Sequence, residues 1–220
     1  MLRDPAFGWV GTATLRDGRA VFVRPARLGD EPLIQAFVRG LSMQSRYQRF
    51  FLPLRELSAE HLKRLTQADA RSQATLLAFE PSGPNAPRIA GMVEYAAEPG
   101  TDTCEFAVVV GENWRRQGLA LRLMDDLRDI AIANGFVQVV IDVLRDNLAA
   151  LELARRFGAR RPEGPTPSGG SVNAGVVRLI VSLRGPVSHS IVFGGGVRPD
   201  AVAIREPSWK RASSISRPYP

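Results

Sequence analysis

The middle of the chain alternates between apolar runs of strand length and segments whose apolar residues recur every three or four positions. The run 104–110 is apolar and rich in β-branched residues, which predicts a strand. Apolar residues at helical spacing over 119–134, with charged residues between them, predict an amphipathic helix that ends at Asn134-Gly135. The same order then repeats, because an apolar run at 136–144 precedes a helical pattern at 147–157. The pattern therefore predicts a strand–helix–strand–helix unit.

Further elements flank this unit on both sides. An Asp17-Gly18 turn introduces an alternating strand, and Asp30, Ser42 and Ser58 are each placed to cap a helix. Strands are expected at 18–25, 74–79, 89–95, 103–110, 136–144 and 174–183, and helices after Asp30, at 43–51 and at 59–67. Short connections between the second, third and fourth of these strands predict an antiparallel meander. The fold class is therefore a mixed α/β domain.

The sequence Arg115-Arg116-Gln117-Gly118-Leu119-Ala120 joins the strand 104–110 to the helix that follows it. The first amides of a helix have no partner within it and point outward at the positive end of the helix dipole, so they suit an anion. Gly118 lets the backbone approach a ligand closely, and the two arginines add charged donors. The turn lacks the Gly-Lys-Ser/Thr of a Walker loop and the glycine spacing of the dinucleotide fingerprint. We therefore expect a phosphate site of another kind; the alternative is a basic turn without a ligand.

Composition and charge exclude several classes of protein. The net charge of +7 comes almost entirely from arginines, which are interleaved with acids and form no basic-aromatic cluster, so we do not expect nucleic-acid binding. One cysteine and two distant histidines indicate neither an internal disulfide nor a metal site. No apolar run is long enough to span a membrane, and the residues from Met1 show no secretory pattern. These features favour a cytoplasmic protein without metal or membrane partners.

The turn and its context resemble the acetyl-CoA site of the GNAT N-acetyltransferase superfamily. There, an Arg-x-x-Gly-x-Ala turn between strand and helix holds the pyrophosphate, and here the residues are Arg115, Arg116, Gln117, Gly118, Leu119 and Ala120. An upstream segment is similar to the acetyltransferase domain of bacterial Pat-type protein lysine acetyltransferases. It contains Leu41-Ser42, Ser45-Arg46-Tyr47 and Arg49-Phe50-Phe51. The resemblance covers roughly 18–181 and implies a GNAT domain over 18–183, with 1–17 as a lead-in. From Arg184 onward the chain loses periodicity, so we expect 184–220 to be a flexible tail.

The resemblance also implies how the fold would hold acetyl-CoA. A mostly antiparallel sheet of about six or seven strands, flanked by helices, would be splayed between its fourth and fifth strands to admit the pantetheine arm. Backbone groups of Val108 and Val110 would pair with that arm as an added strand does. Asn147 matches the GNAT asparagine that contacts the cofactor. The alternative for the valines is simple core packing, and for Asn147 it is a helix N-cap, which is compatible with cofactor contact.

Glu105 is the candidate general base. It is a carboxylate within an apolar strand, where burial raises a carboxyl pKa toward the range useful for a base. In Pat-type enzymes a glutamate at the matching place has this role; the alternative is a solvent-facing or ion-paired glutamate. Asp142 and Glu94 are interpreted as edge or ion-paired strand acids rather than substrate ligands. Strand alternation directs Cys104 to the face opposite Glu105, so it is expected to be a buried core residue.

The predicted reaction is direct transfer of the acetyl group of acetyl-CoA to an amine. A protein lysine is the favoured acceptor, and a small-molecule amine is the alternative. A non-catalytic CoA-binding module is a third possibility, which the carboxylate of Glu105 disfavours. Many GNAT enzymes have a tyrosine that protonates the leaving thiolate where this chain has Ala154. The sequence does not indicate an oligomeric state.

Overall fold

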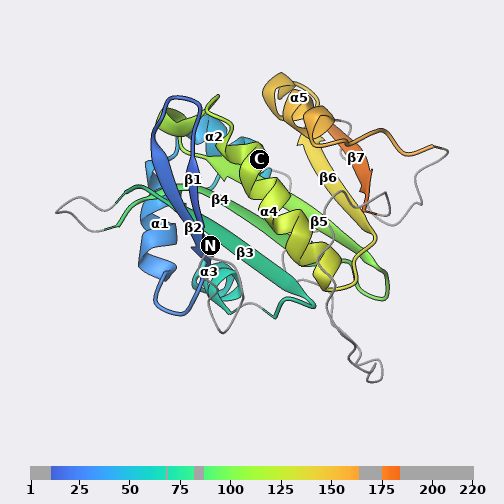
Figure 1. Ribbon diagram of the computed structural model, residues 1–220, viewed down its shortest axis with the longest axis horizontal. Coiled ribbons are helices and arrows are strands. Elements are labelled where there is room, and N and C mark those ends of the chain that lie inside the picture. The colour runs from blue at the N-terminus through green and yellow to red at the C-terminus, as the bar shows by residue number, and fades with distance from the viewer. Residues whose placement is uncertain (1–10, 68, 82–86, 164–174, 184–220) are drawn as a thin grey trace, which may run out of the picture.

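Seven strands form one sheet whose spatial order follows the sequence, β1 to β7 (Figure 1). The structure is a computed structural model, and it describes residues 11–67, 69–81, 87–163 and 175–183. The strands are β1 (Gly11–Thr14), β2 (Ala20–Pro25), β3 (Gln73–Phe79), β4 (Ile89–Ala97), β5 (Thr103–Val110), β6 (Gln138–Leu144) and β7 (Val176–Ser182). The helices are α1 (Glu31–Gly40), α2 (Met43–Phe50), α3 (Ala59–Thr66), the short 3₁₀ helix η1 (Glu112–Trp114), α4 (Leu119–Ala133) and α5 (Leu148–Arg156).

All strand pairs are antiparallel except β5 and β6, which are parallel. The expected meander is therefore confirmed as β3, β4 and β5. A parallel pair needs a crossover, and α4 provides it. The strand β1 was not predicted, and it adds one strand at the edge beside β2. The expected splay between strands four and five thus lies between β5 and β6.

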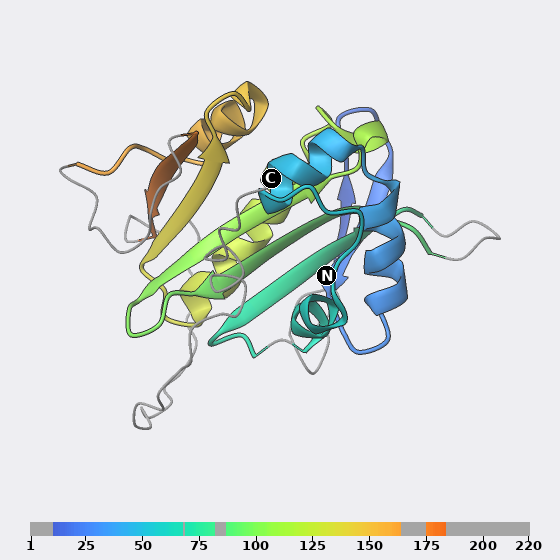
Figure 2. The ribbon, with the colours of Figure 1, turned by 180° about the vertical axis from the view of Figure 1, so that it is seen from behind.

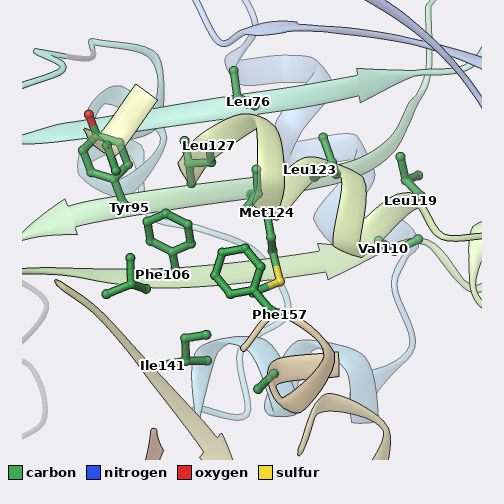
Figure 3. Packing of buried hydrophobic residues seen from close by; sticks show 14 of the residues in the cluster. Leu76, Tyr95, Phe106, Val110, Leu119, Leu123, Met124, Leu127, Ile141 and Phe157 are labelled. Carbon is green, nitrogen blue, oxygen red and sulfur yellow. The ribbon is translucent and has the colours of Figure 1, made fainter. Parts of the chain in front are cut away.

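The two faces of the sheet carry separate hydrophobic clusters. Helix α4 lies across one face, where its buried leucines pack with aromatic residues from β4, β5 and the end of α5 (Figures 1 and 3). Helices α1, α2 and α3 lie over the opposite face (Figure 2). The core there is formed by α1, α3 and residues of β3, β4 and β5. Both faces are covered, which explains why β3 and β4 read as continuous apolar runs rather than alternating ones.

The capping predictions have mixed outcomes. Ser42 accepts a hydrogen bond from the amide of Ser45, and Ser58 accepts one from His61, so both are side-chain N-caps. Asp30 occupies the N-cap position of α1 without a side-chain cap, because its carboxylate is bound to Arg24 at 2.6 and 2.8 Å instead. The boundary expected at residue 18 stays a prediction, although β1 and Leu15 belong to the sheet and core before it. The expected tail, 184–220, lies outside the described residues.

Candidate active site

The parallel ladder between β5 and β6 is short and ends at Glu105. Only residues 103–105 of β5 pair with β6, opposite residues 138–140, and beyond that point the two strands separate (Figures 1 and 2). The remainder of β5 stays paired with β4 along its other edge. The second half of β5 therefore presents one edge that no described strand covers.

The edge of β5 that faces the split carries the backbone groups of Phe106, Val108 and Val110. At the two ends of the β4–β5 ladder, the amide of Gly111 donates to Ala90 at 2.9 Å and the amide of Glu98 donates to Thr103 at 2.8 Å. Antiparallel pairing alternates, so the odd-numbered residues of β5 bond to β4 and the even-numbered ones face the other way. The side chains of Val108 and Val110 meanwhile pack into the core, so the core interpretation holds beside the proposed pairing with pantetheine.

A cavity of about 1500 Å³ runs through the split. Near one end it is lined by residues of the loop before α4, and along its length by Glu105, the second half of β5 and the start of α5. It continues onto the opposite face of the sheet, where α2 and α3 form its wall. One continuous space therefore connects the predicted phosphate loop, the open strand edge and the predicted base.

The loop before α4 has the backbone that a phosphate site needs. Gly118 is the N-cap of α4 with φ of 89°, a left-handed conformation in which glycine is unstrained. Arg116 also has a positive φ, 59°, and its side chain is exposed. Leu119 is buried in the core, so only its backbone faces the loop, while Gly118 and Ala120 line the cavity.

Arg115, predicted as a charged donor to the phosphate, is also engaged in contacts within the protein. Its guanidinium donates to the carbonyl of Val110 at 3.3 Å and to the hydroxyl of Ser45 at 2.7 Å. It also forms an ion pair with Glu112 at 3.3 Å. These contacts tie the end of β5 to α2, so Arg115 shapes the loop besides contributing its charge.

Glu112 is the anionic centre of the same network. It accepts hydrogen bonds from the hydroxyl of Ser45 at 2.5 Å and from the amide of Ser42 at 3.1 Å. Burial by itself would raise the pKa of Glu112, but these hydrogen bonds outweigh it and lower the pKa to about 2. Ser42 and Ser45 of the Pat-like segment thus hold the loop before α4 through Glu112.

Asn147 is the N-cap of α5, as its alternative interpretation predicted. Its side-chain oxygen accepts a hydrogen bond from the amide of Ala150 at 3.1 Å. The residue also lines the cavity, so its amide nitrogen remains available to a ligand. Ala154, at the position of the GNAT tyrosine, is buried and offers no acidic group.

Glu105 occupies the last rung of the β5–β6 ladder, opposite Val140 and beside Ala96 of β4. Its side chain is half-buried and lines the cavity. It points to the face opposite Cys104, which is fully buried and whose pKa is raised to about 12 by that burial. Cys104 is thus an inert core thiol, as expected. The pKa of Arg178 on β7 is raised, first by its hydrogen bonds with Asp142 and further by the negative charge of Glu105.

Two further strand acids lie on the same face as Glu105, and both are ion-paired as predicted. Asp142 is bound by Arg178 with contacts of 2.9 and 2.6 Å. Glu94, one step diagonally from Glu105 on β4, is bound by Arg49 of α2. These pairs leave neither acid as an isolated carboxylate in the cavity wall.

The cavity wall includes residues that the sequence did not single out. His61 of α3 lines it, and burial lowers the pKa of its imidazole to about 4, so it is neutral at pH 7. The nearby Glu94 opposes this shift in pKa and Arg49 adds to it. Only tertiary structure brings His61 of α3 near Glu94 of β4, so no local pattern could have indicated this arrangement.

The split sheet, the open strand edge and the glycine loop at a helix N-terminus are the arrangement of the GNAT fold. The Acetyltransferase (GNAT) family matches residues 41–159. Acetyltransferase PA5475 of Pseudomonas aeruginosa is 32% identical over 164 residues, covering 72% of this chain and 85% of that protein. The chain therefore belongs to the GNAT acetyltransferase family. It is an acetyl-CoA-dependent N-acetyltransferase, and the fold and family expected from the sequence are confirmed.

Solved structures agree. The GNAT domain of PAT from S. lividans has a TM-score of 0.68 and 26% identity, over 79% of this chain and 97% of that one. Spermidine N-acetyltransferase from Vibrio cholerae, in complex with CoA and spermine, shares the fold at a TM-score of 0.56 and 16% identity, over 74% of this chain and 95% of that one. A protein from Salmonella typhimurium, solved with its cofactor acetyl-CoA, also shares the fold. Its TM-score is 0.57 and its sequence identity is 15%, over 83% of this chain and 99% of that one.

Among the described residues, no helix is both long and apolar enough to cross a bilayer. Within the same ranges, no group of histidine, cysteine, aspartate and glutamate side chains is arranged to hold a metal ion. The co-substrate of the GNAT family is acetyl-CoA.

Proposed function

We propose that this enzyme transfers the acetyl group of acetyl-CoA to a protein lysine side chain, with Glu105 as the general base. Arg115, Arg116 and the backbone from Gln117 to Ala120 bind the pyrophosphate. Val108 and Val110 orient the pantetheine arm through their backbone groups. Asn147 contacts the cofactor through its side-chain amide.

The observation that carries this proposal is the position of Glu105 at the point where β5 and β6 separate. From there to Val110 the strand rises about 17 Å, at roughly 3.3 Å per residue. A pantetheine arm paired along this edge, with its pyrophosphate at Gly118, brings its thioester end toward Glu105. The cavity reaches Glu105 both from the cofactor side and from the face covered by α2 and α3, so a base and two reactants can meet there.

The chemistry at this point needs one proton transfer before the acyl transfer. Glu105 removes a proton from the acceptor ammonium through a water molecule, and the free amine attacks the thioester carbonyl. The new C–N bond forms, the C–S bond breaks, CoA departs as a thiolate, and the nitrogen releases its second proton to water as the amide forms. Ala154 offers no proton, so the thiolate takes one from water or leaves as the anion. A positioned base of this kind typically contributes about 10²- to 10⁴-fold in rate.

The acids beside Glu105 disfavour an acceptor with several cationic nitrogens at that point of the cavity. Each additional nitrogen of a polyamine needs a carboxylate that is not already neutralised. The acids flanking Glu105 are occupied: Glu94 by Arg49 and Asp142 by Arg178. The likeness to the GNAT domain of PAT and the Leu41–Phe51 segment agree with a lysine acceptor. Spermidine acetyltransferase from Vibrio cholerae represents the competing class, a small-molecule amine.

The test is a comparison of acceptors under identical conditions. The purified chain is incubated with acetyl-CoA and either a lysine-containing peptide blocked at its amino terminus or spermine, and CoA release is followed. The matched control is the same peptide with lysine replaced by arginine. We expect acetylation of the lysine peptide, confirmed by mass spectrometry, and little activity on spermine. A preference for spermine over every lysine peptide tested would refute the protein-lysine proposal while leaving acetyl transfer intact.

A further inference from the structure

The β1–β2 hairpin contacts the phosphate loop, although it lies about a hundred residues earlier in the sequence. Figures 1 and 2 show the tip of this hairpin beside the loop that precedes α4. The amide of Arg16 donates to the carbonyl of Gln117 at 3.2 Å. Arg19 donates to the carbonyl of Asn113 at 2.9 Å, and its guanidinium lies 4.0 Å from the ring centre of Trp114. Residues on both sides of the hairpin turn therefore contact this loop.

This docking places the guanidinium of Arg16 at the predicted phosphate site. Its Nε lies 3.8 Å from the point that a Cβ atom on Gly118 would occupy, and the side chain lines the same cavity. Gly118 is the N-cap of α4, where the unpaired amides and the helix dipole favour negative charge. Arg16 thus approaches the loop from the edge of the sheet that β1 and β2 form.

The charge of Arg16 is not neutralised by the part of the protein that the structure describes. Its side chain is exposed, and no described acid or carbonyl group bonds it. The neighbouring Arg116 is also exposed. Two cations beside the positive end of a helix repel one another and the dipole, unless an anion lies between them. Arginine suits such an anion, because its planar fork matches phosphate oxygens.

We propose that Arg16 is a further cofactor-binding residue, which holds a phosphate of acetyl-CoA from outside the loop 115–120. The inference rests on the proposed placement of the pyrophosphate at that loop. The chemistry recognised is a phosphate group, and acetyl-CoA has two candidates, the pyrophosphate and the 3′-phosphate of the adenosine. The hairpin then has a functional role, because it brings a third arginine to the cofactor.

The substitution Arg16→Gln isolates the guanidinium. The hydrogen bond from residue 16 to Gln117 comes from the backbone and survives the change, as do the contacts of Arg19. The matched control is Arg71→Gln, which removes the same charge from an exposed position that does not line the cavity. Arg16→Lys is a conservative variant that restores the charge without the planar fork.

The experiment is calorimetric titration of the full chain and these variants with acetyl-CoA, acetyl-dephospho-CoA and acetyl-pantetheine. We expect Arg16→Gln to weaken acetyl-CoA about fivefold, as for a partly exposed charged contact, and Arg16→Lys to recover part of this. Arg71→Gln leaves the affinity unchanged. If the loss disappears with acetyl-dephospho-CoA, the partner of Arg16 is the 3′-phosphate; if it persists, the partner is the pyrophosphate.

Two results would overturn the inference. In one, Arg16→Gln binds acetyl-CoA as tightly as the wild type does, which removes Arg16 from the site and leaves the proposed function standing. In the other, Arg16→Gln weakens acetyl-pantetheine, which has no pyrophosphate or nucleotide, as much as acetyl-CoA, which would indicate a general disturbance of the loop. Failure of the wild-type chain to bind acetyl-CoA at all would instead contradict the proposed function itself.

Discussion

The substitution Gly118→Ala separates backbone strain from cofactor binding. Gly118 has a φ of 89°, and a Cβ atom there would meet only Arg16 Nε, at 3.8 Å, an ordinary contact. The free energy of unfolding therefore falls only by the strain of alanine in a left-handed conformation, about 1–2 kcal/mol. For a domain of this size, each kcal/mol lowers the melting temperature by roughly 2–4 °C. The methyl group would, however, occupy the surface that the phosphate approaches, so we expect acetyl-CoA to bind at least about tenfold more weakly, or about 1.4 kcal/mol.

Gly135 provides the matched control, because it also has a φ of 89° and nothing lies within 4 Å of its Cβ position. Gly135→Ala, at the end of α4 far from the loop, is expected to lower the melting temperature by a similar amount and to leave acetyl-CoA affinity unchanged. The assays are differential scanning fluorimetry and calorimetric titration of each variant. Equal acetyl-CoA affinity in Gly118→Ala and Gly135→Ala would refute the assignment of the pyrophosphate to this loop.

Three further predictions follow from the ion pairs and caps of the site. Because the folded pKa of Glu112 is lowered to about 2 from 4.5, its charge stabilises the fold above about pH 4.5 and this contribution is lost as the pH falls toward 2. Glu112→Gln is therefore expected to be less stable by about 1 kcal/mol at pH 7, after allowance for solvent screening, and equal to the wild type near pH 2 in thermal melts. Asn147→Ala removes the cap of α5 and costs about 1 kcal/mol in urea unfolding, whereas Asn147→Asp keeps the cap but weakens acetyl-CoA binding, because it replaces the amide by a charge. Asp142→Asn leaves Arg178 without its charged partner and is expected to lower the free energy of unfolding by about 1–3 kcal/mol. In a double-mutant cycle with Arg178→Gln, the double variant should lose less stability than the sum of the two single variants. Simple additivity would contradict the pair's role.

Most elements of this fold were predictable from local pattern, and β1 was not. The bounds of α4 and of β3 to β6 lie close to the predicted ones, because apolar periodicity and the stops at Asn134 and Gly158 determine them. The strand β1 was missed because its four residues, Gly-Thr-Ala-Thr, alternate too weakly to distinguish a strand from a lead-in. Its pairing with β2 depends on the hairpin turn and on burial of Ala13 and Leu15, which only the assembled core provides.

The candidate site shows the same division between local and long-range information. The predicted phosphate loop and Glu105 could be singled out from the sequence because both lie within one strand–turn–helix unit. Arg16, by contrast, reaches Gln117 through a hairpin, and Arg49 reaches Glu94 through a helix on the other face. The engagement of Arg115 with Ser45 likewise joins segments that are distant in the sequence. Contacts of this kind depend on how the sheet and helices pack, and the periodicity of apolar residues in the sequence does not predict them.

The central claim, that Glu105 is the base at the split of the sheet, is tested most directly by the rate of Glu105→Gln as a function of pH. The variant keeps the size of the side chain and a polar group at the last rung of the ladder, so acetyl-CoA affinity should be unchanged. The control is His61→Gln, which removes another titratable group of the same cavity wall. The account predicts that kcat/KM for the acceptor falls about 100-fold or more in Glu105→Gln and far less in His61→Gln. A Glu105→Gln enzyme with full activity across the pH range would contradict it.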